Sequence, residues 1–116
     1  MKTLFILNDP PYGTERSYNG LRLAGTLAKR EGSEVRVFLI GDAVGCAVAD
    51  QKVPDGYYLL DRMVESVARH GGEPGCCGTC LDARGIGGDH LTKGARRSTL
   101  DELADWTTWA DKVVTF

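Results

Sequence analysis

The fold is decided by the stretch Glu34-Val35-Arg36-Val37-Phe38-Leu39-Ile40-Gly41-Asp42. Its first seven residues are mostly apolar and rich in β-branched side chains, and glycine and aspartate then end the run. An apolar run of this length between turn residues predicts a strand buried on both faces. Residues 3–7 form a similar run that stops at Asn8-Asp9-Pro10-Pro11. We therefore expect buried strands over residues 3–7 and 34–40.

The segments between and after these runs show helical periodicity. Residues 15–30 place small or apolar side chains on one helical face, namely Tyr18, Leu21, Ala24, Gly25 and Ala28. Glycine lowers helix propensity, so Gly25 is expected to permit close packing on a sheet. Residues 43–49 predict a weaker helix. Residues 60–68 carry Leu60, Met63, Val64, Val67 and Ala68 at helical spacing, and Gly71-Gly72 ends this helix.

The last third of the chain continues the alternation. Residues 73–77 predict a short third strand, and residues 93–97 a weaker fourth one. Thr99 and Glu102 form a capping box, in which Glu102 is expected to reach back to the Thr99 N–H. The helix that follows is expected to turn Leu100, Leu103, Ala104, Thr107 and Ala110 inward, and Trp106 is expected to join the core. Residues 112–116 predict the closing strand.

Strands that alternate with helices predict an α/β fold with a parallel sheet and helices on both faces. The 116 residues match the size of one domain, spanning 1–116. In such folds, reactive groups gather at the carboxyl ends of the strands. Here the loops at that edge are expected over residues 8–14, 41–46 and 77–85.

Charge and composition exclude several classes of function. The net charge of -2 gives no general attraction to nucleic acid or to an anionic membrane. The basic cluster over residues 93–97 is interpreted as a solvated loop. The first apolar run is too short for a signal peptide, and no segment approaches the length of a membrane span. We therefore expect a cytoplasmic protein, where thiols are kept reduced.

Thiol chemistry is the clearest chemical signature of the chain. Three of the four cysteines are Cys76, Cys77 and Cys80, and the last two have C-x-x-C spacing. Only the thiolate is nucleophilic, and nearby cations or helix N-termini favour it. The residues expected to support it are Thr79, as a hydroxyl donor, and Arg84, as a cation. Asp82 is expected to oppose the thiolate unless it pairs with Arg84.

Four interpretations of the cysteines compete. A sulfur carrier needs one exposed nucleophilic cysteine, with a second one to resolve the persulfide. A dithiol oxidoreductase would use the Cys77–Cys80 pair, although the thioredoxin-like motif normally opens a long helix after the first strand. A zinc site over Cys76, Cys77, Cys80 and His90 lacks a second C-x-x-C half-site. The fourth interpretation is inert burial, which suits Cys46 best and Cys76 next.

An ordered set of motifs resembles a known family. The motifs are Leu4-Phe5-Ile6-Leu7-Asn8, Pro11-Tyr12-Gly13-Thr14-Glu15, Leu21-Arg22-Leu23-Ala24, Phe38-Leu39-Ile40-Gly41-Asp42-Ala43-Val44, Cys77-Gly78-Thr79-Cys80 with Asp82 and Arg84-Gly85, and Ala110-Asp111-Lys112-Val113-Val114-Thr115-Phe116. Over nearly its whole length the chain resembles the DsrE/DsrF-like family, most closely its YchN-like branch. The resemblance implies a DsrEFH-like three-layer α/β/α sandwich with a five-stranded parallel sheet. It also implies hexamers, often built from two trimers, with cysteine loops near the subunit contacts.

Characterised relatives in this family look like sulfur-relay proteins, and their sulfur-bearing cysteine falls where Cys77 stands. We therefore expect a sulfurtransferase-type persulfide carrier without a metal or cofactor. Cys77 would accept sulfur, Cys80 would resolve or stabilise the persulfide, and Arg84 would stabilise the anion. Tyr12-Gly13 is expected either to shape the rim of this site or simply to form a turn after the two prolines.

The expected partners are sulfur-donor and sulfur-acceptor proteins and further copies of the chain, as a homohexamer or homotrimer. Direct nucleic-acid and membrane partners are not expected. A dithiol–disulfide redox protein and a non-catalytic oligomeric binding module remain as alternatives.

Overall fold

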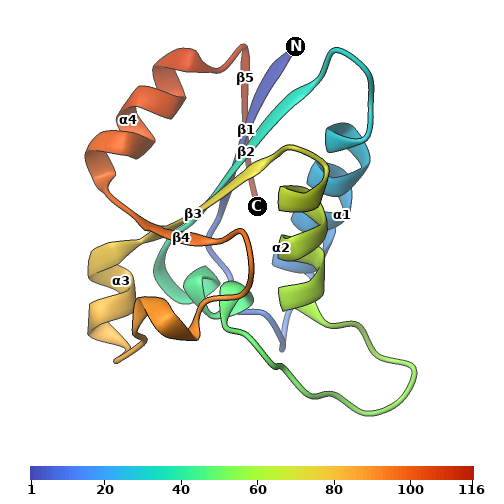
Figure 1. The fold of residues 1–116 in the computed structure, drawn as a ribbon, viewed down its shortest axis with the longest axis vertical. Coiled ribbons are helices and arrows are strands. Elements are labelled where there is room, and N and C mark those ends of the chain that lie inside the picture. Colours follow the sequence, from blue (N-terminus) through green and yellow to red (C-terminus); the bar gives the residue numbers. More distant parts are fainter.

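The computed structural model describes residues 1–116 and contains one five-stranded sheet (Figure 1). The strands are β1 (Lys2–Leu7), β2 (Glu34–Leu39), β3 (Glu73–Cys77), β4 (Arg96–Ser98) and β5 (Lys112–Thr115). They lie in the order β4-β3-β2-β1-β5, and every neighbouring pair is parallel. The expected α/β fold with a parallel five-stranded sheet is confirmed.

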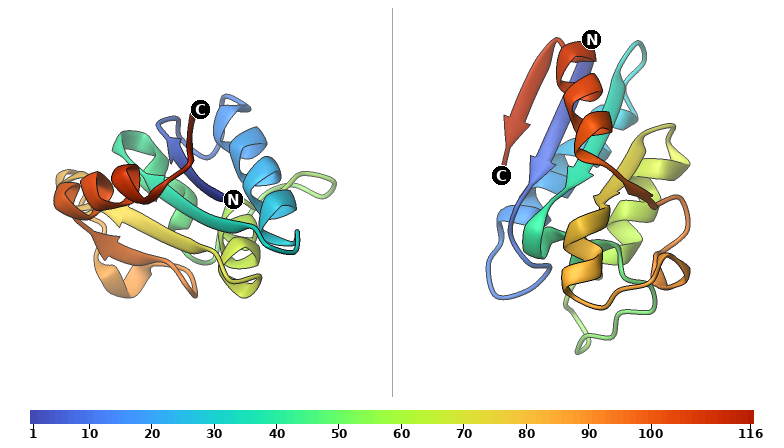
Figure 2. Two further views of the ribbon diagram at one scale, coloured as in Figure 1. Left: turned by 90° about the horizontal axis from the view of Figure 1, so that it is seen from above. Right: turned by 90° about the vertical axis from the view of Figure 1, so that its left-hand side faces the viewer.

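Helices cover both faces of the sheet. The α-helices are α1 (Arg16–Ala28), α2 (Leu60–Arg69), α3 (Gly78–Ala83) and α4 (Leu100–Trp109), and two 3₁₀ helices, η1 (Gly41–Ala47) and η2 (Gly88–His90), complete the set. Helices α1 and α2 pack on one face and α4 lies on the other (Figure 2). Helix α3 lies beyond the carboxyl ends of the strands, near η1. None of these helices has the length and apolar content needed to cross a membrane.

The two central strands form the core, as their apolar runs predict. Leu4, Phe5 and Leu7 of β1 are fully buried, and so are Val37 and the two residues after it on β2. Each such side chain contributes about 1.5–3 kcal/mol when it leaves water. Burial on both faces follows from the parallel sheet, since helices cover each side of these strands.

Three element predictions differ from the structure. The fourth strand is Arg96–Ser98 rather than 93–97, and the helical segment after β2 is η1, Gly41–Ala47, rather than 43–49. The expected loop over 77–85 begins with helix α3. Helix α3 has six residues, which is less than two turns and too short to show helical periodicity in the sequence.

The prediction of which side chains of α4 point inward was wrong for three of them, whereas Leu103 and Ala110 pack against the core and Trp106 lies in it. Leu100 is 70% exposed and Ala104 and Thr107 are exposed, whereas Trp106 is buried at 3% exposure. Trp106 packs edge-on against Phe38, with ring centroids 6.1 Å apart. Its burial removes more apolar area from water than a leucine does, so the tryptophan sets the rotation of the helix.

The capping box at the start of α4 is half formed. The Thr99 hydroxyl oxygen accepts a hydrogen bond from the Glu102 N–H at 3.1 Å. The Glu102 carboxylate does not return to Thr99. It binds the Arg96 guanidinium at 2.7 and 2.9 Å and accepts a hydrogen bond from Ser98.

The glycine that permits close packing of α1 is Gly20, not Gly25. A Cβ added to Gly20 would lie 2.5 Å from a Leu7 methyl carbon and 3.1 Å from the Phe116 ring. A Cβ on Gly25 would meet nothing within 4 Å. Gly25 therefore weakens the helix without any packing requirement.

Replacing Gly25 with alanine should stabilise the protein by about 0.5–1 kcal/mol, because alanine loses less backbone entropy in a helix. The matched change Gly20→Ala should destabilise it by about 1–3 kcal/mol through overpacking. Urea unfolding of the two variants and the wild type measures both effects. Equal effects of the two substitutions would contradict this account of α1.

Candidate functional site

Cys77 lies where β3 ends and α3 begins. It is the last residue of the strand and the N-cap of the helix, and it is 8% exposed. Side chains alternate along a strand, so the preceding Cys76 points the other way and is fully buried. The register of the strand therefore turns Cys77, and not Cys76, toward the end of the sheet where α3 begins.

A pocket of about 450 Å³ opens beside this thiol. Its lining comes from the ends of β2, β3 and β4 and the starts of α3 and α4, and comprises Ile40, Cys77, Gly78, Thr79, Cys80, Arg97, Ser98, Thr99 and Leu100. The carboxyl edge of the sheet therefore forms the candidate site, as the sequence predicts.

The surroundings of Cys77 favour its thiolate. Burial opposes the charge, but hydrogen bonds from the Cys80 thiol, the Thr79 hydroxyl and the backbone N–H groups of Thr79 and Cys80 outweigh it and lower the pKa of Cys77. The Thr79 oxygen lies 3.4 Å from the Cys77 sulfur. Cys77 is therefore the nucleophile of the pair.

Cys80 has the opposite properties. Burial and the hydrogen bond to Cys77 raise the pKa of Cys80, although the Gly41 N–H lowers it in part. That N–H donates to the Cys80 sulfur at 3.2 Å. Cys80 therefore stays protonated, and its S–H can donate a hydrogen bond to the Cys77 sulfur.

The two arginines near the site have different roles from those predicted. Arg84 binds the Asp42 carboxylate at 2.7 and 3.2 Å and donates to the Cys80 carbonyl at 3.0 Å, so it ties α3 to η1. Asp82 pairs not with Arg84 but with Arg97, at 2.8 and 2.9 Å. The hydrogen bond from Arg97 holds the pKa of Asp82 below its usual value.

Arg97 is the lining residue that the sequence analysis missed. Its guanidinium lies across Gly78, where an added Cβ would come within 2.8 Å of Nε. Gly78 thus lets a cation approach the start of α3, next to Cys77. The signal was present in the basic cluster at residues 93–97, but only the pairing of β3 with β4 brings Arg97 to the thiol.

Tyr12 and Gly13 lie outside this pocket. The Tyr12 hydroxyl donates to Gln51 Oε1 at 2.6 Å and accepts from the Leu60 N–H at 3.3 Å, and its ring stacks on Tyr58. Gly13 has a φ of 100° and no atom near its added Cβ, as expected for a turn. Of the predicted residues, Cys77, Thr79 and Cys80 line the pocket. Asp82 and Arg84 lie outside its lining and contact it through Arg97 and through the Cys80 carbonyl. Tyr12 and Gly13 are not part of it.

The remaining thiols are buried and unreactive. Burial raises the pKa of Cys46 and of Cys76 to about 12, and both are fully buried. The structure assembles no group of three or more His, Cys, Asp or Glu side chains, so the zinc set with His90 does not form.

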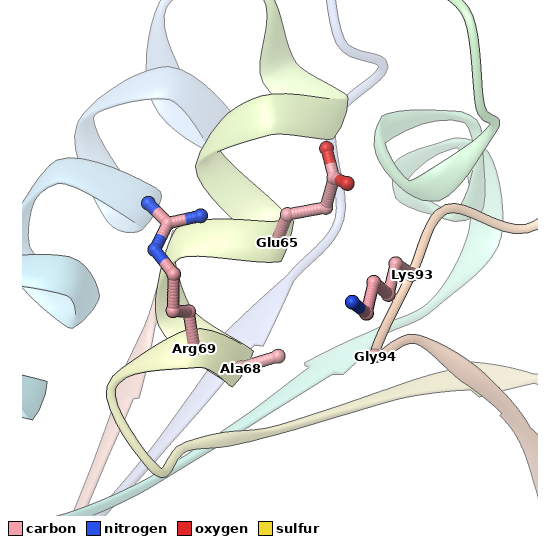
Figure 3. A pocket seen from close by; sticks show the side chains of 5 residues that line it. All are labelled: Glu65, Ala68, Arg69, Lys93 and Gly94. Atoms are coloured by element: carbon pink, nitrogen blue, oxygen red, sulfur yellow. The ribbon is translucent and has the colours of Figure 1, made fainter.

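A second pocket, of about 340 Å³, lies between α2 and the turn at Lys93-Gly94 (Figure 3). Its side chains are those of Glu65, Ala68, Arg69 and Lys93, three of which are charged. It contains no cysteine, so the Cys77 pocket is the better candidate for thiol chemistry.

Comparison with known proteins gives consistent matches over the whole chain. Residues 1–116 match the DsrE/DsrF-like family. Protein YchN of Escherichia coli K12 is 40% identical over 116 residues, covering 99% of this chain and 98% of that protein. An uncharacterized protein of Methanocaldococcus jannaschii is 38% identical over 119 residues, covering all of both chains.

Two solved structures share the fold. The crystal structure of the E. coli YchN protein superposes with a TM-score of 0.93 at 40% identity, covering 100% of this chain and 99% of that one. A protein of unknown function from Methanobacterium thermoautotrophicum superposes with a TM-score of 0.77 at 17% identity, covering 99% and 98%. The second match shows the fold alone.

Cys77 should be the first thiol that iodoacetamide alkylates, with a reaction midpoint below the ordinary pKa of a thiol. Replacing Cys80 with alanine should raise that midpoint and slow alkylation severalfold at pH 7, because the thiolate loses its strongest hydrogen bond. Mass spectrometry after timed alkylation at a series of pH values measures both effects. Cys46→Ala is the control and should leave the midpoint unchanged. Alkylation of Cys46 or Cys76 before denaturation would contradict this assignment.

Proposed function

Because this chain belongs to the DsrE/DsrF-like family, we propose that it is a cytoplasmic persulfide carrier that accepts sulfur on Cys77. Family membership supplies the sulfur-relay context. The observation that carries the proposal is a thiol with a lowered pKa on the wall of a pocket, hydrogen-bonded to Cys80 and Thr79. The carrier would pass its sulfur to a protein acceptor.

The loading step follows from the lowered pKa of Cys77. The thiolate attacks the outer sulfur of a donor persulfide, R–S–SH. A new S–S bond forms to Cys77, the S–S bond of the donor breaks, and R–S⁻ leaves and takes up a proton. The step needs no oxidant, because one S–S bond forms as another breaks and the oxidation state of the transferred sulfur does not change.

The pocket supports this step by its contents and size. The Thr79 hydroxyl and the Cys80 thiol face the Cys77 sulfur and can donate to the anionic outer sulfur of the persulfide. Arg97 supplies a cation in the same lining, and a volume of about 450 Å³ has room for a donor side chain. Delivery of the sulfur reverses the loading step with an acceptor thiolate as the nucleophile.

A second candidate function uses the cysteine pair itself. The hydrogen bond between Cys77 and Cys80 places two thiols of different pKa side by side, which also suits dithiol–disulfide exchange. In a loaded carrier, attack of the Cys80 thiolate on the Cys77 sulfur would form the Cys77–Cys80 disulfide and release HS⁻. The two functions therefore use the same pair of cysteines. The carrier passes its sulfur to an acceptor thiol, whereas formation of the Cys77–Cys80 disulfide releases that sulfur as HS⁻.

Donor and acceptor proteins are the proposed partners of this site, with self-association as a homohexamer or homotrimer. The support is the family context, in which sulfur passes between protein thiols. Native mass spectrometry reports the number of subunits.

The proposal predicts that Cys77→Ser abolishes sulfur loading, whereas Cys80→Ser still loads and keeps the persulfide longer. Reduced protein is incubated with a cysteine desulfurase and cysteine, or with glutathione persulfide, and its intact mass is measured. A gain of one sulfur that maps to Cys77 and is lost with reductant is the expected result. Loading of the Cys77→Ser variant at the wild-type level would refute the assignment. Loss of two hydrogens linking Cys77 to Cys80, without added sulfur, would favour the redox function.

A further inference from the structure

Arg97 carries the only permanent charge in the lining of the Cys77 pocket. The other lining residues are aliphatic, hydroxyl-bearing, glycine or cysteine, and none of them is an aspartate or a glutamate. The Arg97 guanidinium lies against the first turn of α3, because a Cβ added to Gly78 would come within 2.8 Å of Nε and 2.9 Å of Nη2. The pocket therefore holds one cation, next to the residue that follows Cys77.

The charge of Arg97 acts on the reactive sulfur. The hydrogen bonds to Asp82 raise the pKa of Arg97, and the charge of Cys77 raises it further. The guanidinium and the Cys77 thiolate therefore attract each other. A group bound to Arg97 would be held near the sulfur that attacks the donor.

Arg97 keeps hydrogen-bond donors for a second anion. A guanidinium has five N–H groups, and the two bonds to the Asp82 carboxylate use one on Nη1 and one on Nη2. The other three N–H groups, including that of Nε, have no acceptor in the chain. The pair is also exposed, at 51% for the Arg97 side chain and 62% for that of Asp82. Solvent screens such a pair, so an incoming carboxylate can share Arg97 or displace Asp82 from it.

The rest of the pocket suits a small molecule. Its volume of about 450 Å³ lies within the range of about 300–1,000 Å³ that small-ligand sites occupy. The Thr99 oxygen accepts a hydrogen bond from the Glu102 N–H, so its own hydroxyl proton stays free to donate to a ligand. Ile40 and Leu100 supply aliphatic surface in the same lining. A donor with a carboxylate and a short aliphatic stem would therefore meet a cation, a hydroxyl group and apolar contacts beside the thiolate.

We propose that Arg97 determines the donor specificity of the site by binding the carboxylate of a small persulfide, such as that of N-acetylcysteine or glutathione. Charge-assisted bonds from a guanidinium to a carboxylate are strong and directional, so they would hold the donor while the Cys77 thiolate attacks its outer sulfur. The S–S bond to Cys77 forms as the S–S bond of the donor breaks, and the carboxylate-bearing thiolate leaves and takes up a proton. This inference rests on the proposed function, to which it adds a class of donor.

The first test alkylates Cys77 with iodoacetate, which carries a carboxylate, and with iodoacetamide, its neutral counterpart. Both reagents react with the same thiolate, so the ratio of their rate constants cancels any change in its nucleophilicity. Dividing this ratio by the one measured for 2-mercaptoethanol removes the intrinsic difference between the reagents. For the wild type we expect a normalised ratio of about three to ten at low ionic strength, which falls toward one in high salt because Arg97 is exposed.

Substitutions at the ion pair test the role of its charges. Arg97→Gln should bring the normalised ratio close to one, Arg97→Lys should keep part of it, and Asp82→Asn should raise it by removing the competing carboxylate. Arg62→Gln is the matched control and should leave the ratio unchanged, because Arg62 is an exposed arginine of α2, on the other face of the sheet from α4 (Figure 2). If Arg97→Gln does not fold, Gly78→Ala keeps every charge but displaces the guanidinium with its Cβ, and should also lower the ratio.

The second test measures sulfur loading by intact mass, with N-acetylcysteine persulfide and with the persulfide of N-acetylcysteine amide. The acid should load Cys77 severalfold faster than the amide, and Arg97→Gln should remove the difference. A wild-type normalised ratio of one, or an Arg62→Gln variant as strongly affected as Arg97→Gln, would overturn the inference. Equal loading by both persulfides would also overturn it and leave the proposed function standing. A preference in alkylation without loading by either persulfide would reject the proposed function and leave the anion site at Arg97 standing.

Discussion

The register of β3 against β2 is the constraint on which this site depends. Leu39 pairs with Cys76, so Cys77 falls one residue beyond the paired segment of β2, where α3 begins. A slip of one residue would reverse the faces of both cysteines and bury the thiol that now lines the pocket. The same pairing brings Gly41 to Cys80, where its N–H meets the sulfur. The core of the sheet and the chemistry of the cysteine pair are therefore set together.

Hydrogen bonds at the start of α3 make the two cysteines unequal. The Cys80 thiol donates a hydrogen bond to the Cys77 sulfur, and this bond lowers the pKa of Cys77 and raises the pKa of Cys80. Burial alone does not create this difference, because it raises the pKa of both thiols. The short helix α3 creates it, since one turn of helix returns Cys80 to the start of the helix beside Cys77.

Features that depend on local sequence were predictable, and features that depend on tertiary contacts were not. The strands at residues 3–7 and 34–40 can be recognised from their continuous apolar runs, which a buried strand of a parallel sheet needs. The C-x-x-C spacing likewise identifies the thiols directly. The partner of Asp82 could not be chosen from sequence, since Arg84 and Arg97 are both within reach of a loop and only the β3–β4 pairing decides between them. The exposure of Leu100 was also unpredictable, because periodicity alone places it on the inward face and only the packing of Trp106 on Phe38 fixes the rotation of α4.

The short strand β4 has a consequence for the outer border of the sheet. It contains only Arg96, Arg97 and Ser98, and it pairs with β3 on one side alone. An unpaired border strand is a template on which a foreign strand can add and begin aggregation, and natural proteins prevent this with brevity and with charge. Here two adjacent arginines, each held by a carboxylate, meet both conditions. Arg97 and Ser98, which line the thiol pocket, therefore also help to protect the open border of the sheet against growth.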